Sequence, residues 1–266
     1  DELMKHTSLF EDSKEEYKNC KSCKNLAACK NKMTGFCFLP VLKEGKLNFS
    51  YVACKYKEKY LSDCKYQKNV TSMDVPREIR EAKIKDIYTD DKQREKVIKW
   101  ILNYIKEYKK GNFGKGLYLH GNFGCGKTYL LAAMFNELAK ENVRSVITYW
   151  PEYLRSLKSS YSSSSSYEFK DKYNEVKYAK LLLIDDLGAE GVTSWSRDEI
   201  LGTILQYRMQ EHLPTFITSN LNLKELEEHL SVSTTNKSER VKAVRIIERI
   251  KQLTIDAEMI GQNNRK

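Results

Sequence analysis

Short apolar runs alternate along the chain with longer segments in which apolar residues recur every three or four positions. The short runs have strand composition and lie at residues 117–119, 145–150, 181–184 and 215–218. The helix-like segments lie at residues 77–88, 91–108, 129–140, from 151 onward, and 240–253. Apolar strands that alternate with amphipathic helices form parallel sheets covered by helices, so the pattern predicts an α/β fold.

The helix expected at residues 91–108 carries the clearest apolar stripe. Val97, Ile101 and Ile105 share one face with Ile98 and Leu102, which predicts packing against the sheet rather than a partner site. The preceding helix begins after a proline, where a missing N–H costs little. The polar residues before it, 65–76, are expected to form a linker.

Three other stretches are less regular. Residues 1–18 are polar with few apolar anchors, which predicts a short helix or a frayed end, and residues 47–54 have strand character. The serine-rich tract from Ser159 to Ser166 cannot pack a core and is expected to be an exposed loop. Residues 231–239 are also polar and predict a loop before the last helix.

Charge is distributed unevenly along the 266 residues. Of the net charge of +10, residues 1–70 carry 14 Lys and Arg against 9 Asp and Glu, whereas residues 111–266 carry 21 against 19. A basic front favours contact with a polyanion such as nucleic acid, although such a surface also serves solubility. The sequence has no secretory signal and no apolar run long enough to span a bilayer, so we expect a cytoplasmic protein.

Cysteines divide the chain in the same way, since six of seven lie within residues 20–64. Cys20 and Cys23 form a Cys-x2-Cys turn that presents two thiolates, and tetrahedral zinc needs a second pair from elsewhere. Cys37 and Cys54 are the best candidates for that pair. Two further cysteines compete with them, Cys29 and Cys64. In a reducing compartment the cluster predicts one structural zinc ion, with ordinary reduced cysteines as the alternative.

The stretch after the apolar run at 117–119 carries the strongest chemical signal. It reads Gly121-Asn122-Phe123-Gly124-Cys125-Gly126-Lys127-Thr128 and opens a helix at Tyr129. This is the G-x-x-x-x-G-K-T pattern between a strand and a helix, in which backbone N–H groups and the helix dipole bind a triphosphate. Lys127 would reach the β- and γ-phosphates, and the Thr128 hydroxyl would hold Mg²⁺. Residues 121–129 are therefore predicted to bind ATP.

The apolar run at 181–184 ends in two carboxylates, Asp185 and Asp186. Beside a phosphate loop, Asp185 would hold the water shell of Mg²⁺ and Asp186 would polarise the attacking water. Asn220 follows the run at 215–218, where an amide could orient the same water. These residues predict ATP hydrolysis at the edge of the sheet.

Two arginines lie four residues apart on the last helix, Arg245 and Arg249, and so share one face. Such a pair usually marks a solvated surface. In an ATPase that assembles into a ring or filament, one of them would instead reach the γ-phosphate of a neighbour's nucleotide.

With these residues in view, the chain resembles the bacterial helicase loaders of the DnaI type, in the DnaC-like group of AAA+ ATPases. The likeness covers nearly all of the chain. It is carried by Gly116-Leu-Tyr-Leu-His-Gly121, Ile184-Asp-Asp-Leu-Gly-Ala-Glu190, Thr193-Ser-Trp195, Leu213-Pro-Thr-Phe216 and Arg245-Ile-Ile-Glu-Arg249. The Asp-Asp-Leu-Gly-Ala-Glu block with a downstream Thr-Ser-Trp is far more specific than a phosphate loop alone.

The resemblance implies both a function and a division of the chain. Loaders of this family bind the hexameric replicative helicase and place it on single-stranded DNA in an ATP-dependent way when replication starts. The implied parts are a zinc-binding, helicase-contacting domain at 1–70, a linker helix at 71–90 and an AAA+ ATPase domain at 91–266. Hydrolysis by the lone monomer is expected to be weak and to be stimulated on assembly.

The resemblance also implies residue roles. It assigns Lys127 and Thr128 to the nucleotide and Asn220 to a sensor position, and it makes Arg249 the first choice and Arg245 the second for the arginine finger. The family's zinc ligands look like three cysteines and one histidine. Cys37 stands where the histidine would be, so the implied set is four thiolates, Cys20, Cys23, Cys37 and Cys54.

Two other functions stay open. A non-hydrolysing adaptor would use ATP only as a switch, which Asp186 allows because many AAA+ proteins carry the longer glutamate there. A transposition helper of the IstB type would share the ATPase core, although nothing in transposon targeting requires a zinc module.

Overall fold

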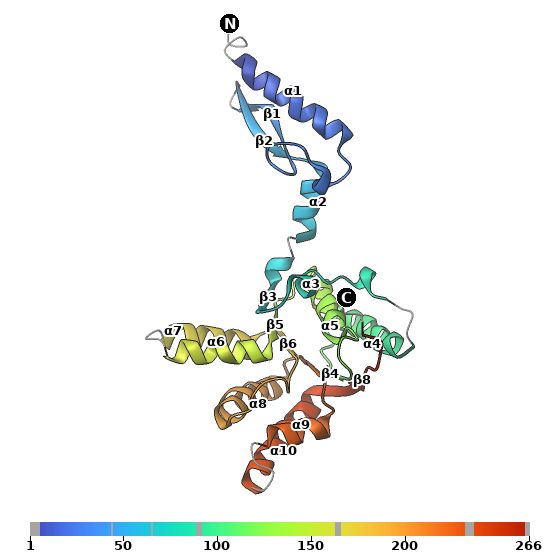
Figure 1. Ribbon diagram of the computed structural model, residues 1–266, viewed down its shortest axis with the longest axis vertical. Coiled ribbons are helices and arrows are strands. Elements are labelled where there is room, and N and C mark those ends of the chain that lie inside the picture. Colours follow the sequence, from blue (N-terminus) through green and yellow to red (C-terminus); the bar gives the residue numbers. More distant parts are fainter. Residues whose placement is uncertain are drawn as a thin grey trace. The chain divides into compact units, whose positions relative to one another are not determined.

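The computed structural model describes residues 6–43, 45–64, 66–88, 92–162, 166–231 and 237–263. The chain forms two compact units, residues 1–65 and residues 66–266 (Figure 1). Each unit has its own helices and its own sheet. Among the residues described, every helix is too short or too polar to span a lipid bilayer.

The first unit is a helix packed on a hairpin. Its elements are α1 (Thr7–Ser22), the short 3-10 turn η2 (Leu26–Ala28), β1 (Phe36–Lys43), β2 (Lys46–Ala53) and α2 (Lys55–Cys64). β1 and β2 pair antiparallel along their whole length, from Phe36 opposite Ala53 to Lys43 opposite Lys46. The buried carboxylate of Glu16 on α1 accepts the backbone N–H of Phe38 at 2.7 Å, which joins the helix to the hairpin.

The second unit is built on a six-stranded parallel sheet. Its strands are β3 (Val70–Met73), β4 (Gly116–His120), β5 (Ser145–Tyr149), β6 (Leu181–Asp185), β7 (Thr215–Ser219) and β8 (Thr254–Glu258), in the order β3-β5-β6-β7-β4-β8. Strands that are apolar on both sides are typical of a parallel sheet covered on both faces. β4, β6 and β7 are buried along their whole length, which confirms the α/β prediction.

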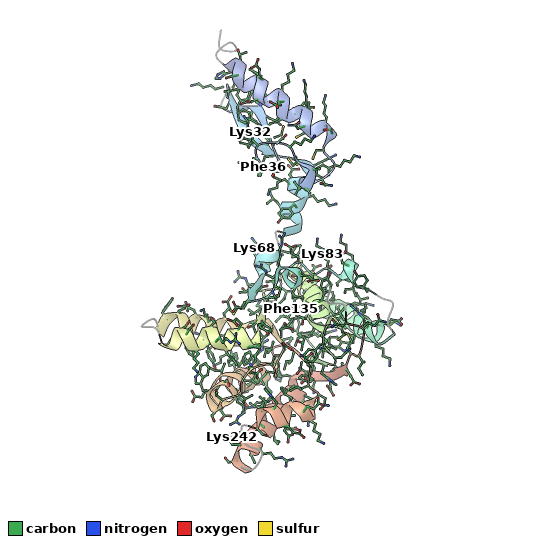
Figure 2. The ribbon with its side chains drawn as sticks, in the orientation of Figure 1. Lys32, Phe36, Lys68, Lys83, Phe135 and Lys242 are labelled. Atoms are coloured by element: carbon green, nitrogen blue, oxygen red, sulfur yellow. The ribbon has the colours of Figure 1, made fainter. Side chains whose placement is uncertain are left out.

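Helices cover both faces of this sheet (Figure 1). One face packs against the small helix α3 (Arg77–Arg80), α4 (Lys92–Lys109) and α5 (Lys127–Ala139). The other packs against α6 (Trp150–Ser162), α7 (Ser166–Tyr178), α8 (Gly202–Gln210), α9 (Leu223–Leu230) and α10 (Lys237–Leu253). On β6, Leu181 and Leu183 join the first core while Leu182 and Ile184 join the second, as the alternation of a strand requires. Phe135 of α5 lies in the first core against Phe216 (Figure 2).

The expected linker at 65–76 is wrong in part, because residues 70–73 form the edge strand β3. Val70 pairs with Ser145 and Met73 with Thr148, so the boundary between the units lies at residues 65 and 66 rather than at 70. The single helix expected at 77–88 is also replaced by two short pieces, α3 and the 3-10 turn η4 (Ile84–Asp86). A second 3-10 turn, η3 (Gln67–Asn69), leads into the strand.

The serine tract is not a loop throughout. α6 continues to Ser162 and α7 starts at Ser166, while residues 163–165 lie outside the described part. Ser160 is buried, and its hydroxyl donates to the Ser156 carbonyl at 3.0 Å. A serine can satisfy its hydroxyl in this way inside a helix. Of the predicted loop at 231–239, residues 232–236 lie outside the described part and Lys237 already begins α10.

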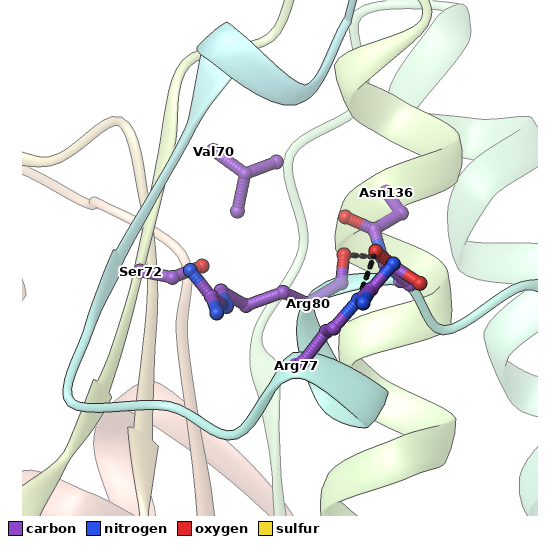
Figure 3. Close-up of a pocket in the computed structure, with 6 residues that line it drawn as sticks. Val70, Ser72, Arg77, Arg80 and Asn136 are labelled. Atoms are coloured by element: carbon purple, nitrogen blue, oxygen red, sulfur yellow. Dashed lines mark hydrogen bonds and ion pairs between the residues drawn. The ribbon is translucent and has the colours of Figure 1, made fainter. Parts of the chain in front are cut away.

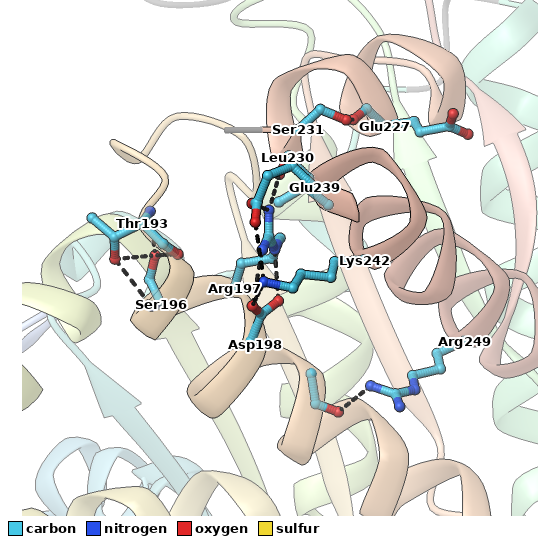
Figure 4. Close-up of polar contacts among 11 residues, drawn as sticks. Thr193, Ser196, Arg197, Asp198, Glu227, Leu230, Ser231, Glu239, Lys242 and Arg249 are labelled. Carbon is cyan, nitrogen blue, oxygen red and sulfur yellow. Dashed lines mark hydrogen bonds and ion pairs between the residues drawn. The ribbon is translucent and has the colours of Figure 1, made fainter. Parts of the chain in front are cut away.

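A buried arginine in the segment that follows β6 binds the end of α9 and the start of α10 (Figure 4). A π-helical segment, η5 (Trp195–Leu201), precedes α8 and carries Arg197, whose side chain is fully buried. Arg197 donates to both carboxylate oxygens of Asp198, at 2.7 and 2.8 Å, to Glu239 at 2.7 Å and to the Leu230 carbonyl at 3.0 Å. Lys242 reaches the same two carboxylates. These bonds fix the start of α10 to η5.

Candidate active site

The predicted phosphate loop connects β4 to α5, as the sequence pattern requires. Gly126 has φ +92°, a left-handed conformation that favours glycine. Gly121 has φ +141°, and a Cβ built there would lie 2.0 Å from the Met259 carbonyl oxygen. Both glycines are therefore required by the local backbone, and the loop leads into the N-terminus of a helix, which favours anions.

Lys127 is held inside this loop by three oxygen atoms. Its Nζ donates to the carbonyls of Gly121 at 2.9 Å and Asn122 at 2.8 Å, and to Oδ1 of Asn220 at 2.9 Å. The side chain is largely buried. Two predicted residues thus meet directly, since Asn220 comes from the end of β7 and Lys127 from the start of α5.

Thr128 and Asp185 also meet directly. The Thr128 hydroxyl donates to Oδ1 of Asp185 at 2.6 Å, and the hydroxyl of Thr218 donates to the same oxygen at 2.6 Å. Burial raises the pKa of Asp185 above its usual value, and the two hydroxyls oppose that rise. A hydroxyl and a carboxylate side by side form the oxygen donor set that Mg²⁺ prefers. The residues present therefore fit a magnesium ion.

Asp186 lies next to these groups in an unusual backbone conformation, with φ +59°. Its N–H donates to Thr218 Oγ1 at 2.9 Å, and its Oδ1 accepts Nδ2 of Asn220 at 2.8 Å. Asn220 therefore bridges Lys127 and Asp186 with the two ends of one amide. This arrangement links the lysine predicted to bind phosphate to the carboxylate predicted to act on water.

The sequence did not indicate Thr218, although it holds both carboxylate residues. β6 and β7 run parallel with Ile184 beside Ile217, so the next residues along the two strands are Asp185 and Thr218. Thr218 is one of two threonines in the strand-like run at 215–218, so composition does not single it out, and only the strand register gives it a partner.

The remaining predicted loop residues differ in exposure. Phe123 is 65% exposed, whereas Cys125 is fully buried and its thiol donates to the Asn122 carbonyl at 3.1 Å. The chain that follows β8 runs along the loop, because the Asn122 amide donates to the Gly261 carbonyl at 2.6 Å and accepts the Gly261 N–H at 3.0 Å. Tyr129, at the first turn of α5, accepts the backbone N–H of Lys83 through its hydroxyl at 3.4 Å.

The two candidate finger arginines lie in different surroundings on α10. Arg249 is half-buried and its Nη1 donates to the Gly202 carbonyl at 2.8 Å (Figure 4). Burial, and then the neighbouring Arg245, lowers the pKa of Arg249. Arg245 is exposed. The face that they share therefore presents one arginine to solvent and one bound to its own chain.

A second feature is a polar pocket of about 310 Å³ beside β3 (Figure 3). It is lined by Val70, Ser72, Arg77, Arg80, Glu81 and Asn136. Arg77 pairs with Glu81 at 2.8 Å, and Nδ2 of Asn136 donates to the carbonyls of Arg80 and Ala82. Most of the polar groups that line the pocket are therefore occupied by bonds within the chain.

The predicted zinc ligands lie in the first unit. Burial and then a hydrogen bond with Cys20 raise the pKa of the Cys37 thiol, and Cys54 adds to the rise. These three cysteines are therefore neighbours. Cys23 instead donates its thiol to the Asn25 carbonyl at 3.1 Å.

The part of the chain that the structure describes contains no group of three or more Cys, His, Asp or Glu side chains that could hold a metal ion. The side chain of Cys64 lies outside that part. Cys29, the other competitor, accepts the Gly35 N–H on its sulfur at 3.3 Å. The described side chains thus do not form a complete four-cysteine site, and zinc stays a prediction.

Comparisons with known proteins show to which family the chain belongs. Residues 51–253 match the family model of the AFG1-like ATPases. The replicative helicase loader DnaI of Bacillus subtilis (strain 168) is 38% identical over 251 residues, which span 94% of this chain and 80% of that protein.

Solved structures give the same result. A crystal structure of DnaI superposes with a TM-score of 0.64 at 45% identity, covering 76% of this chain and all of that one. A crystal structure of the DnaC helicase loader superposes with a TM-score of 0.53, covering 69% of this chain and 99% of that one. Its 21% identity makes it a likeness of fold.

Proposed function

The chain belongs to the AFG1-like ATPases and to the family of the replicative helicase loader DnaI, and we propose that it uses ATP to load a hexameric replicative helicase onto single-stranded DNA. The observation that carries this proposal is the 38% sequence identity to DnaI over a stretch that spans 94% of the chain. The assembled site supports it, since Lys127, Thr128 and Asp185 occur where an ATPase needs them.

The proposed chemistry follows from the contacts of these residues. A magnesium ion, held near Thr128 and Asp185, would supply charge neutralisation for the phosphates. Lys127 would exchange its carbonyl partners for phosphate oxygens, which are stronger acceptors because they are charged. Asp186 would accept a proton from, or orient, the attacking water, and the Asn220 amide would hold that carboxylate in place.

We infer that hydrolysis is weak in the monomer and rises on assembly. Two arginines on α10 are proposed to serve a neighbouring subunit, with Arg249 first and Arg245 second. An arginine supplied in trans typically adds on the order of 10³-fold or more to phosphoryl transfer. Self-association in the helicase complex would bring one of them to the phosphates.

The first unit is proposed to contact the helicase and to hold a structural zinc ion. The proximity of Cys20, Cys37 and Cys54 supports the zinc proposal, although the described side chains do not form a complete site. Metal analysis of protein purified in metal-free buffer would decide it. About one equivalent of zinc is expected for a tight structural site, and markedly less would remove zinc from the proposal.

Native mass spectrometry of the chain mixed with the replicative helicase of its own host, with and without ATP, tests the central proposal. We expect a defined loader–helicase complex. The same mixture with Lys127→Ala protein is the control for the nucleotide. The absence of any complex at micromolar concentration would contradict helicase loading.

The same preparation separates the two alternatives. Preferential binding to double-stranded DNA would favour a transposition helper. Equal helicase loading by Asp186→Asn protein would favour an adaptor for which ATP is only a switch, because nucleotide would still bind. Loss of loading in this variant is expected for an enzyme that must hydrolyse ATP.

A further inference from the structure

Arg94, near the start of α4, is a buried arginine beside the phosphate loop. Only 6% of its surface is exposed. If a Cβ were present on Gly126, it would lie 3.3 Å from Nη2 of Arg94 and 3.7 Å from Cζ. The guanidinium therefore packs directly against the glycine that precedes Lys127.

Its position on the helix is one that normally carries an apolar side chain. Val97 and Ile101 lie three and seven residues farther along α4, on the same face, and both are buried in the core under the sheet. Arg94 extends this stripe by one turn toward the loop. An apolar side chain would pack there without the free-energy cost of burying a charge.

The charge is not balanced within the described part of the chain. The Nε of Arg94 is buried, and no hydrogen-bond partner for it occurs among those residues. Burying an ionised group is costly unless it is paired and hydrogen-bonded. Lys127, the other buried cation of this loop, differs in having three oxygen partners.

The geometry points to Arg94 as a nucleotide-binding residue whose guanidinium pairs with a phosphate of the bound nucleotide. The N-terminus of α5 and the Arg94 guanidinium, which packs against Gly126, both favour negative charge at this loop. A guanidinium also presents several N–H donors in a fixed fork that matches phosphate oxygens. This inference rests on the proposed function, because it takes the ATP site as given and adds a ligand group to it.

The test measures affinity for Mg-ATP and Mg-ADP by calorimetric titration of the full chain and three variants. Arg94→Met keeps a side chain of similar length and its apolar contacts but removes the positive charge. Arg94→Lys keeps the positive charge but lacks the forked set of N–H donors of a guanidinium. Lys96→Gln is the matched control, since Lys96 is exposed on the same helix and loses the same charge. The thermal midpoint of each nucleotide-free protein is measured alongside.

We expect Arg94→Met to weaken both nucleotides by about 10-fold or more, the range for a hydrogen bond to a charged group. Arg94→Lys should be intermediate and Lys96→Gln unchanged. The nucleotide-free Arg94→Met protein should be at least as thermally stable as the unmodified chain, because an unpaired buried charge has been removed.

Wild-type affinity in Arg94→Met would overturn this inference and leave the proposed function intact. A loss of affinity accompanied by a lower thermal midpoint, with no recovery in Arg94→Lys, would mean that Arg94 only supports the loop, and would also overturn it. No nucleotide binding by the unmodified chain would overturn the proposed function and this inference together.

Discussion

Thr218 donates its hydroxyl to Oδ1 of Asp185 at 2.6 Å and, with the same oxygen, accepts the N–H of Asp186 at 2.9 Å. One side chain on β7 therefore positions both carboxylate residues at the end of β6. The Thr128 hydroxyl approaches Asp185 from the phosphate loop, so Asp185 is held from two sides.

Replacing Thr218 by valine keeps the shape of the side chain and removes both hydrogen bonds. We expect stimulated ATP turnover to fall about 10-fold or more, because a hydrogen bond to a charged group contributes about 1.5–3 kcal/mol. The magnesium concentration needed for half-maximal turnover should rise. Turnover measured against magnesium in the helicase mixture checks both effects.

Thr148 offers a matched control on β5, which flanks β6 on the side opposite β7. It is fully buried, and its hydroxyl has no hydrogen-bond partner among the residues that the structure describes. Thr148→Val therefore removes an unsatisfied group and should leave turnover and stability unchanged or slightly improved. If Thr218→Val turned over ATP as fast as Thr148→Val, the positioning role of Thr218 would be wrong.

Asp185 should make the stability of the protein depend on pH. Burial raises its folded-state pKa above the unfolded value, so between those two values the folded protein holds a proton that the unfolded chain releases. Its contribution to stability is therefore present at low pH and is lost as pH rises through the folded pKa. Asp185→Asn removes this loss, so its stabilising effect should grow as pH rises from the unfolded pKa to the folded pKa and stay constant above it.

Thermal unfolding in a chelating buffer measures that effect, with a shift of about 2–4 °C for each kcal/mol in a domain of this size. Asp198→Asn is the opposite control. The Arg197 guanidinium lowers the pKa of Asp198, so its contribution is present above the unfolded pKa and is lost as pH falls. The two variants should thus differ in sign at pH 8, and equal signs would contradict the assignment.

Much of the fold and of the site could be predicted from the sequence, because the determining features are local. A buried parallel strand is apolar on both sides, so residues 181–184 were identified directly, and the glycine spacing identified the phosphate loop. Lys127, Thr128, Asp185, Asp186 and Asn220 converge in the structure.

The features that were missed depend on partners far along the chain. Residues 70–73 are too short and polar to indicate a strand, and they form β3 only because β5 offers a free edge. β8 follows α10 without a turn signal and likewise pairs with β4. The role of Thr218 depends on the strand register, and the role of Arg94 depends on the packing of α4 against the loop. Neither can be read from the composition of the sequence.

The buried arginine Arg197 should be a major determinant of stability. Removing one partner of a buried ion pair costs about 3–5 kcal/mol, and partial exposure of the carboxylates brings the expected cost of Arg197→Met nearer to 2 kcal/mol. Lys242→Met is the control, since Lys242 contacts the same carboxylates from a half-exposed position and should cost clearly less than Arg197→Met. Chemical denaturation of both variants gives the comparison, and equal costs would refute the special role of Arg197.

The arginines of α10 can be tested for action in trans. We expect Arg249→Ala to bind ATP normally and to lose stimulated turnover by on the order of 10³-fold, with a smaller loss for Arg245→Ala. Arg249 also donates to the Gly202 carbonyl, so the variant alone does not separate a finger from a structural contact within one chain.

Mixing two inactive proteins makes that separation. Lys127→Ala keeps the arginine but lacks a working nucleotide site, whereas Arg249→Ala keeps the site but lacks the arginine. In an equal mixture that assembles head to tail at random, about one contact in four joins an intact site to an intact arginine, so about a quarter of wild-type turnover should return. Arg249 could instead act only by its hydrogen bond to Gly202 of its own chain. Every subunit with an intact nucleotide site would then still lack that bond, and the mixture would stay inactive.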